Sequence, residues 1–400
     1  MRSDQIRSRF FDFFHGLGHL LREPGPVVSD DDTVLFTGAG MFQFKPYFLG
    51  EEHPPHPRLM SGQPCVRTVD IDNIGYTSRH STSFEMLGSF SFGDYFKLEA
   101  MRWALDLLVD GYGLERERLW VTILHDDEET FGLWRRLGLP EERIQRLGLK
   151  DNFWSMGVPG PSGPNSEIFY DRGSRFGSEG GPALNSERYL EIWNLVFMHL
   201  LRGNSDEEIL GELPNKNVDT GLGLDRLAMV LQNVDHIQQI DLHRPLTESL
   251  LGLTGHDKPT LSHRILSDHL RTSLLLISHG IGPGNDGRRY VLRRLLRRSI
   301  RHLRLLGLDE PALGELTGSE IVTREEVGFG RTLRVGTRLL EKSLETVHNG
   351  RLPGSVAFQL HDRHGFPIEL TSEISRESGV EVEIEEFRRL MDEHRRISAR

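Results

Sequence analysis

Three side chains that can carry positive charge precede one aromatic ring: Arg67, Arg79, His80 and then Phe84. A nucleoside triphosphate needs such a set, because fixed positive charge binds its phosphates and a flat apolar ring stacks on its base. The segments flanking residues 68–75 suit β-strands, which predicts an antiparallel pair joined by a mobile, acidic connector. Arg67 should leave the first strand, and Arg79 and His80 should enter the second, with Phe84 further along it. The alternative is an ordinary hairpin with a solvated polar tip.

Three further segments contain residue types suited to binding. Asn194 lies in an apolar segment, 190–198, that predicts a strand; a buried Asn must be hydrogen-bonded, so it is a structural clasp or a substrate ligand. Residues 218–231 predict a glycine-rich turn that opens a helix, whose N-terminus can hold an anion. Residues 153–171 predict a rigid Gly/Pro loop leading into a short strand.

Periodicity and turn residues predict the elements that position these groups. The first helix carries apolar residues at helical spacing, interrupted by acids, which indicates a packed helix rather than a signal peptide; they are Ile6, Phe10, Phe13, Phe14 and Leu17. A linker is expected at 24–33, strands at 34–37 and 119–124, and helices at 97–109 and 126–137.

The composition changes after about residue 245. We predict a domain boundary within 240–260, giving a first domain at 1–245 and a second, mainly helical domain at 246–400. Helices are expected in the second domain at 261–281, 287–306 and 385–400.

One helix of this second domain is strongly basic. Its apolar stripe consists of Val291, Leu292, Leu295, Leu296, Ile300, Leu303 and Leu306. Its arginines are Arg288, Arg289, Arg293, Arg294, Arg297, Arg298, Arg301 and Arg304. Such a localised field predicts a clamp on a nucleic-acid backbone, and arginine favours bidentate phosphate contacts. Membrane-surface binding and a solvated face paired to nearby acids are the alternatives.

Composition narrows the protein class. Hydrophobic content of 37% and charged content of 27% are typical of a globular chain, and 400 residues suggest two or three domains. The formal charge is −11, so any nucleic-acid contact must come from a local patch. The single cysteine, Cys65, excludes an internal disulfide and a cysteine-built zinc site, and favours a reducing, cytoplasmic compartment. No apolar run reaches the roughly 18 residues of a membrane-spanning helix.

Taken together, these segments resemble the aminoacylation module of alanyl-tRNA synthetases, a class II family. Collinear matches run from the first helix to the last residues of the chain. They include Cys65-Val-Arg67, Gly75-Tyr-Thr-Ser-Arg-His80, Phe84-Glu-Met-Leu-Gly-Ser-Phe-Ser-Phe-Gly-Asp-Tyr-Phe96, Asp151-Asn-Phe-Trp154, Tyr189-Leu-Glu-Ile-Trp-Asn194, Asp219-Thr-Gly-Leu-Gly-Leu-Asp-Arg226 and His361-Asp-Arg-His-Gly-Phe-Pro367.

The resemblance implies an α+β fold: an antiparallel sheet flanked by helices, followed by a mainly helical domain that grips the tRNA acceptor stem. It implies that ATP, with Mg²⁺, and alanine form alanyl-adenylate, and that the alanyl group then moves to tRNA(Ala). No zinc is expected.

The resemblance also implies roles for single residues. Arg67 would bridge the α-phosphate and the amino-acid carboxylate, Phe84 would stack on adenine, and Arg226 would bind the γ-phosphate, assisted by Arg79 or His80. Asp219 would pair with the alanine ammonium. The amino-acid pocket would be completed by Trp154, Asn194 and Gly221. The residues implied at the tRNA acceptor stem are Asn285 and Asp362, to which the basic helix adds Arg293, Arg294 and Arg297.

The sequence departs from the family in several places. It stops at residue 400, where members continue into editing and oligomerisation domains, so we expect a monomer and a separate deacylase that edits in trans. The loop 68–75 lacks a Gly-Gly-Lys-His insertion of many bacterial members. Ser162 and Asn165 replace two cysteines, and Asp225 replaces a glutamate. These departures keep open a paralogue that passes alanine, or another small amino acid, to a non-tRNA acceptor such as a carrier protein or a natural-product intermediate. A non-catalytic descendant that binds RNA or an amino acid is a third reading.

Overall fold

The computed structural model describes residues 1–28 and 34–398, and the chain divides into two units, Met1–Thr272 and Ser273–Arg400. The first unit therefore contains residues 246–272, which the sequence analysis assigns to the second domain. That predicted division concerns the roles of the two parts rather than their compactness, and it stays a prediction. The predicted linker at 24–33 lies partly outside the described residues.

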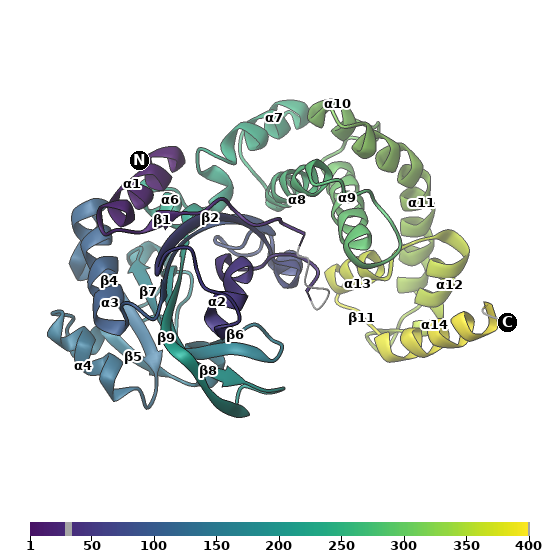
Figure 1. Cartoon of the computed structure of the whole chain (residues 1–400). Coiled ribbons are helices and arrows are strands. Elements are labelled where there is room, and N and C mark those ends of the chain that lie inside the picture. The colour runs from purple at the N-terminus through teal and green to yellow at the C-terminus, as the bar shows by residue number, and fades with distance from the viewer. Residues whose placement is uncertain (29–33, 399–400) are drawn as a thin grey trace. The chain divides into compact units, whose positions relative to one another are not determined.

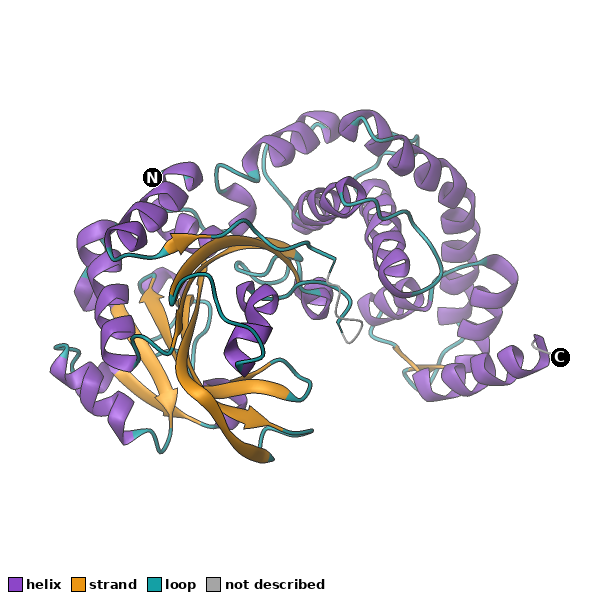
Figure 2. Ribbon diagram, in the orientation of Figure 1, coloured by secondary structure: helices purple, strands orange, loops and turns teal. Residues whose placement is uncertain are grey.

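The first unit is built on a mainly antiparallel sheet (Figure 2). Within the described residues its strands lie in the order β1-β2-β3-β9-β8-β7-β4-β5, with the short β6 added to β7. The pairs β1–β2 and β4–β5 are parallel. The strands are β1 (Leu20–Leu21), β2 (Arg58–Val66), β3 (Ser83–Phe92), β4 (Leu119–Leu124), β5 (Ile144–Leu147), β6 (Phe153–Ser155), β7 (Gly160–Asp171), β8 (Tyr189–Arg202) and β9 (Ile209–Gly223).

Helices pack on both faces of this sheet (Figure 1). Along β8, Leu195 and Phe197 point into a core formed with α1, α3, α4 and α6, whereas Val196 and Met198 point into a core formed with α2. This alternation is the period of two that a strand imposes. The helices are α1 (Ser3–Gly16), α2 (Lys45–Leu49), α3 (Lys97–Asp106), α4 (Glu128–Arg136), α5 (Leu149–Asn152), α6 (Leu224–Leu231), α7 (Arg244–Thr254) and α8 (Leu261–Ser278), whose last residues enter the second unit.

The second unit is mainly helical, as the sequence predicts. It contains a two-stranded parallel sheet of β10 (Arg351–Leu352) and β11 (Glu381–Val382). Its helices are α9 (Gly287–Leu305), α10 (Leu313–Thr317), α11 (Glu320–Leu344), α12 (Gly354–His364), α13 (Ile368–Glu377) and α14 (Ile384–Ser398). The predicted apolar stripe of α9 is buried from Val291 to Leu303, and Leu306 lies just beyond the helix end.

Several predicted elements are confirmed. The hairpin exists, because β2 pairs antiparallel with β3 from Arg58↔Ser91 to Val66↔Ser83. The strand at 119–124 is β4, and the helices predicted at 97–109 and 126–137 correspond to α3 and α4. The first helix buries Ile6, Phe10 and Phe14.

Other predictions differ from the structure. Residues 34–37 form no strand. The Gly/Pro segment is not a loop to its end, because β7 begins at Gly160 and continues through two prolines. The glycine-rich segment at 218–223 is the end of β9 rather than a turn, and its small residues allow close pairing with β8. The connector after Arg67 contains a 3-10 helix at Thr68–Asn73.

In the ranges 1–28 and 34–398, we find no helix with both the length and the apolar character needed to cross a membrane.

The approach of β7 to β8 yields a stability prediction. A methyl group on Gly163 would lie 2.1 Å from the carbonyl oxygen of Phe197, a backbone atom that cannot move aside easily. Gly163→Ala should therefore lower the free energy of unfolding by about 1–3 kcal/mol in urea denaturation. The matched control is Gly132→Ala in α4, where a methyl group meets nothing within 4 Å. This control should be stabilised by up to about 1 kcal/mol. Equal effects of the two changes would contradict the predicted clash.

Candidate active site

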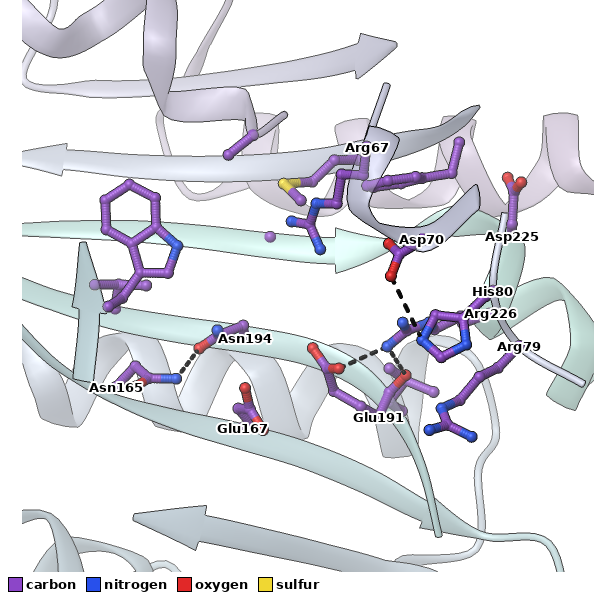
Figure 3. A pocket seen from close by; sticks show the side chains of 18 of the residues that line it. Arg67, Asp70, Arg79, His80, Asn165, Glu167, Glu191, Asn194, Asp225 and Arg226 are labelled. Atoms are coloured by element: carbon purple, nitrogen blue, oxygen red, sulfur yellow. Dashed lines mark hydrogen bonds and ion pairs between the residues drawn. The ribbon is translucent and has the colours of Figure 1, made fainter. Parts of the chain in front are cut away.

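A cavity of about 380 Å³ lies on the α2-facing side of the sheet (Figure 3). The structure brings all the predicted nucleotide and amino-acid residues together around it: Arg67, Arg79, His80, Phe84, Trp154, Asn194, Asp219, Gly221 and Arg226. These residues come from β3, β6, β8, β9, α6 and the connector between β2 and β3. Their convergence gives one cavity with cationic groups and a buried carboxyl group. The role of each residue stays a prediction.

Arg67 and Phe84 lie next to one another where the connector joins β2 and β3. Arg67 directly follows β2, and its Nε donates to the Gly38 carbonyl oxygen at 3.1 Å. Its guanidinium carbon lies 5.0 Å from the centroid of the Phe84 ring, within cation–π range. Cys65 pairs with Phe84 across the strands, so the hairpin register itself brings the guanidinium and the ring together.

Arg79 and His80 precede the second strand instead of entering it, because β3 begins only at Ser83. Arg79 donates to Glu187 at 2.7 Å, and the His80 ring shares a 2.7 Å hydrogen bond with the Thr77 hydroxyl. Burial and the neighbouring Arg79 lower the pKa of His80. This favours the neutral imidazole, which leaves the arginines as the positive groups of this wall.

Arg226 opens the other wall. It lies in the first turn of α6, and its Nη1 donates to Glu191 Oε2 at 2.6 Å (Figure 3). Burial alone would raise the pKa of Glu191, but the charge and hydrogen bond of Arg226 outweigh it and lower that pKa. Glu167 lies on the neighbouring strand, where burial and the charge of Glu191 raise its pKa well above the usual value. Neighbouring carboxyl groups thus favour different protonation states.

The amino-acid end of the cavity is formed by paired positions of β8 and β9. Asn194 lies opposite Gly221, and Val196 lies opposite Asp219. Asn165 of β7 donates its side-chain amide to Asn194 Oδ1 at 2.8 Å, so Asn194 is hydrogen-bonded within the protein while it lines the cavity. The clasp and ligand interpretations of Asn194 are therefore compatible.

Asp219 is a buried carboxyl group with an unusual environment. Burial raises its pKa to about 7, and no charged partner in the described part of the chain opposes that shift. A methyl group on Gly221, two residues along the same strand, would lie 2.7 Å from Met86 Sδ. This end of the cavity therefore combines a carboxyl group suited to a cation with a glycine that Met86 leaves no room to replace.

Sequence reasoning missed several lining residues: Lys150, Asp151, Glu167, Glu191 and Met86. Glu167 and Glu191 carry a signal that could have been used, since each is a single acid within an apolar strand segment. Met86 and Lys150 carry none, because an apolar strand residue and a surface lysine are ordinary. Asn165 had been identified only as a departure from the family pattern.

The predicted tRNA-binding residues lie in the second unit. Arg293 donates to Asn285, and Arg297 donates to Glu325 of α11 at 2.8 Å. Arg294 lies on the same helix, half-buried. Asp362, on α12, lies 3.3 Å from the His394 ring of α14.

The arginines of α9 do not form one solvated face. Arg298 and Arg301 are buried, and both donate to Glu373 of α13, at 3.0 and 3.1 Å. Two of the eight arginines are thus committed to an internal ion-pair network. The basic patch predicted from composition is smaller than its arginine count suggests.

Comparison with known proteins agrees with this geometry. The family described as tRNA synthetases class II (A) matches residues 5–320 and 317–400. The chain belongs to this family. An alanine–tRNA ligase of Streptomyces avermitilis is 49% identical over 99% of this chain and 49% of its own length. One of Frankia casuarinae is 47% identical over 100% of this chain and 49% of its own length.

This class II chain spans about half the length of the curated relatives it matches. Among solved structures, a histidyl-tRNA synthetase of S. aureus aligns with a TM-score of 0.37 and 12% identity over 64% of this chain and 77% of that chain. A likeness of that degree supports no argument.

The raised pKa of Asp219 yields a second prediction. The folded state holds a proton on this group that the unfolded state loses near pH 3.8, so this contribution to stability is present below pH 3.8 and is lost as pH rises through about 7. Asp219→Asn removes the titration. It should leave stability little changed at pH 4 and raise it at pH 8, by an amount on the order of a few kcal/mol. Urea denaturation at the two pH values measures the difference, and an identical effect at both would refute the assignment.

Proposed function

We propose that this class II chain activates alanine with ATP and transfers the alanyl group to the 3′ end of tRNA(Ala). One observation carries the proposal. A buried carboxyl group, Asp219, shares a cavity with Arg67 and Arg226. A small zwitterion can place its ammonium group against Asp219 and its carboxylate toward Arg67 and Arg226.

The reaction follows from this placement. A carboxylate oxygen of alanine attacks the α-phosphorus of ATP, the bond to the bridging oxygen breaks, and pyrophosphate leaves. Arg67 neutralises charge on the reacting groups, and Arg226 holds the outer phosphates. Phe84 offers the adenine a stacking surface, and Arg79 or His80 assists Arg226 at the γ-phosphate. Mg²⁺ bound to the triphosphate would add to the charge neutralisation that the arginines provide.

The proposed pocket selects by size. Met86 lies so close to Gly221 that a methyl group on Gly221 would meet its sulfur at 2.7 Å, and we propose that the alanine methyl group lies beside these two residues. A pocket of this kind separates substrates that differ by one methyl group or one hydroxyl by only about 10–200-fold. We therefore propose that a deacylase hydrolyses mischarged tRNA.

For the second unit we propose contact with the acceptor stem of tRNA(Ala). The residues proposed for it are Asn285, Arg293, Arg294, Arg297 and Asp362. The matched relatives are alanine–tRNA ligases, which supports this choice of partner. We place the reaction in the cytoplasm, where tRNA charging occurs.

A second candidate is transfer of the activated amino acid to an acceptor other than tRNA, such as a carrier protein. The observation in its favour is the internal use of Arg298 and Arg301, which reduces the charge offered to RNA. The two functions share the activation step and differ only in the acceptor.

One experiment separates these functions. Amino-acid-dependent exchange of ATP with labelled pyrophosphate is measured across the twenty amino acids, and charging of tRNA(Ala) follows. Exchange with alanine together with charging is the expected result. Exchange without charging would leave the second candidate, and no exchange with any amino acid would exclude both.

Asp219→Ala should abolish alanine-dependent exchange, because the ammonium loses its only proposed counter-charge. Asp106→Ala is a matched control, since burial also raises the pKa of Asp106 and this residue is not among those lining the cavity. Retained exchange in Asp219→Ala, with Asp106→Ala unchanged, would remove Asp219 from its proposed role.

Replacing Arg293, Arg294 and Arg297 together by Ala should weaken tRNA charging and reduce its salt dependence while exchange persists. The change in salt slope is the informative quantity, because each lost phosphate contact lowers it by about one unit. Replacing Arg388, Arg389 and Arg395 of α14 removes the same charge elsewhere in the unit and serves as the control. Similar losses of charging in both variants would mean that general charge, rather than this site, governs binding.

A further inference from the structure

One face of α8 contacts residues 75–83, the segment that immediately precedes Phe84 in the proposed nucleotide site. The residues on this face recur at intervals of three or four, which places them on one side of a helix. We call it the α8 face; it consists of Leu261, Arg264, Ile265, Asp268, Arg271 and Thr272.

The N-terminal half of the α8 face holds Gly75, at the start of the segment. Gly75 has a φ of +84°, and a side chain there would meet Leu261 Cδ1 at 2.7 Å and Ile265 Cγ1 at 3.0 Å. Arg264 Nε donates to the Gly75 carbonyl oxygen at 3.1 Å. Backbone conformation, packing and a hydrogen bond therefore fix the same point.

The C-terminal half holds Thr82 and Ser83, immediately before Phe84. Asp268 accepts from the Thr82 backbone N–H at 2.8 Å and from its hydroxyl at 2.5 Å. Arg271 donates to the Ser83 carbonyl oxygen, and the hydroxyls of Ser83 and Thr272 lie 2.8 Å apart. Both residues are therefore held to α8 by hydrogen bonds of their backbone and of their hydroxyl groups.

Thr82 also connects α8 to Arg67. The Arg67 backbone N–H donates to the Thr82 carbonyl oxygen at 2.9 Å. One residue therefore uses its N–H and hydroxyl on Asp268 and its carbonyl on the backbone of Arg67. Movement of Thr82 would displace both the guanidinium and the Phe84 ring that faces it.

The contacts between α8 and Thr82 depend on buried ionisable groups, whose desolvation costs more free energy than the burial of apolar side chains. Asp268 and His269 are 2% and 0% exposed, and their side chains pair at 2.9 Å. Burial would raise the pKa of Asp268, but hydrogen bonds from His269 and Thr82 and the charge of Arg271 outweigh it and lower that pKa. Buried ion pairs are weak stabilisers compared with apolar residues of the same volume. The advantage of Asp268 is orientation, because its two carboxylate oxygens fix the direction of the N–H and the hydroxyl of Thr82.

We propose that the α8 face is a positioning surface for the nucleotide site, in which Asp268 acts through Thr82 to fix Arg67 and Phe84. The proposal rests on the proposed ATP-dependent function. It predicts that loosening this contact weakens ATP binding, which uses both Arg67 and Phe84, more than alanine binding, which uses Arg67 of the two.

Two isosteric variants test it in the full chain. Thr82→Val removes the hydroxyl bound by Asp268. Thr247→Val is the matched control, because Thr247 is also a buried threonine whose hydroxyl bonds to α8, at Ser267, on a residue outside the α8 face. Calorimetric titration measures the Kd for ATP, and exchange kinetics measure the KM values for ATP and for alanine.

Thr82→Val should raise the Kd and KM for ATP roughly tenfold, the loss expected for a hydrogen bond to a charged group, and raise the KM for alanine by a smaller factor. Thr247→Val should leave all three within about twofold while lowering the thermal midpoint comparably. Thr82→Ser, which keeps the hydroxyl, should bind ATP nearly as the parent chain does. If Thr82→Val does not fold, Ser83→Ala tests the neighbouring contact, with the same direction expected.

An unchanged ATP affinity in Thr82→Val, or equal changes in both valine variants, would overturn the positioning role. An affinity in Thr82→Ser as low as in Thr82→Val would overturn it as well. Since calorimetry needs no turnover, a parent chain that binds ATP but shows no exchange would contradict the proposed function alone, and the comparison of variants would still decide this inference.

Discussion

The register of the antiparallel strands β7, β8 and β9 determines where the amino-acid end of the cavity lies. Asn194 of β8 is opposite both Glu167 of β7 and Gly221 of β9, and Asp219 of β9 is opposite Val196. A slip of one residue would turn these side chains to the opposite face. The apolar residues between them resist that slip, because Leu195, Val218 and Leu222 would then leave their core. The hydrophobic effect on one face therefore fixes the polar geometry on the other.

The carboxyl groups of the cavity have pKa values shifted in opposite directions. Burial raises the pKa of Asp219, whereas Arg226 lowers the pKa of Glu191, which is half-buried. A protonated group can accept an incoming cation only by releasing its proton, so an ammonium and a proton compete for Asp219. Glu191 already has its cation and serves to orient Arg226 instead. The cavity thus contains one carboxyl group that can take up a ligand cation, Asp219, and one that is already paired with an arginine, Glu191.

The sequence was sufficient to predict the hairpin, some helices of both units and nine of the residues that meet in the cavity. It failed where structure depends on distant partners. The extent of β7 through Pro161 and Pro164 depends on pairing with β8 and β6, which local propensity does not include. Glu167 and Glu191 were missed because a single acid in a strand reveals its role only once Arg226 is beside it. The Asp268 contact to Thr82 joins residues 186 positions apart, beyond the reach of any local pattern.

The basic helix shows why composition alone overestimates a binding surface. Glu373 faces Arg298, Arg301 and His302, so one carboxylate on α13 holds three nitrogen-bearing side chains of α9. Removing one partner of a buried pair leaves an uncompensated charge and costs about 3–5 kcal/mol. These residues are therefore required for packing α9 against α13, and they cannot turn outward without that loss. Only the half-buried and exposed arginines of the helix can meet a phosphate. The charge available for RNA thus depends on which face of α9 the acids of neighbouring helices occupy, a property of the fold rather than of the arginine count.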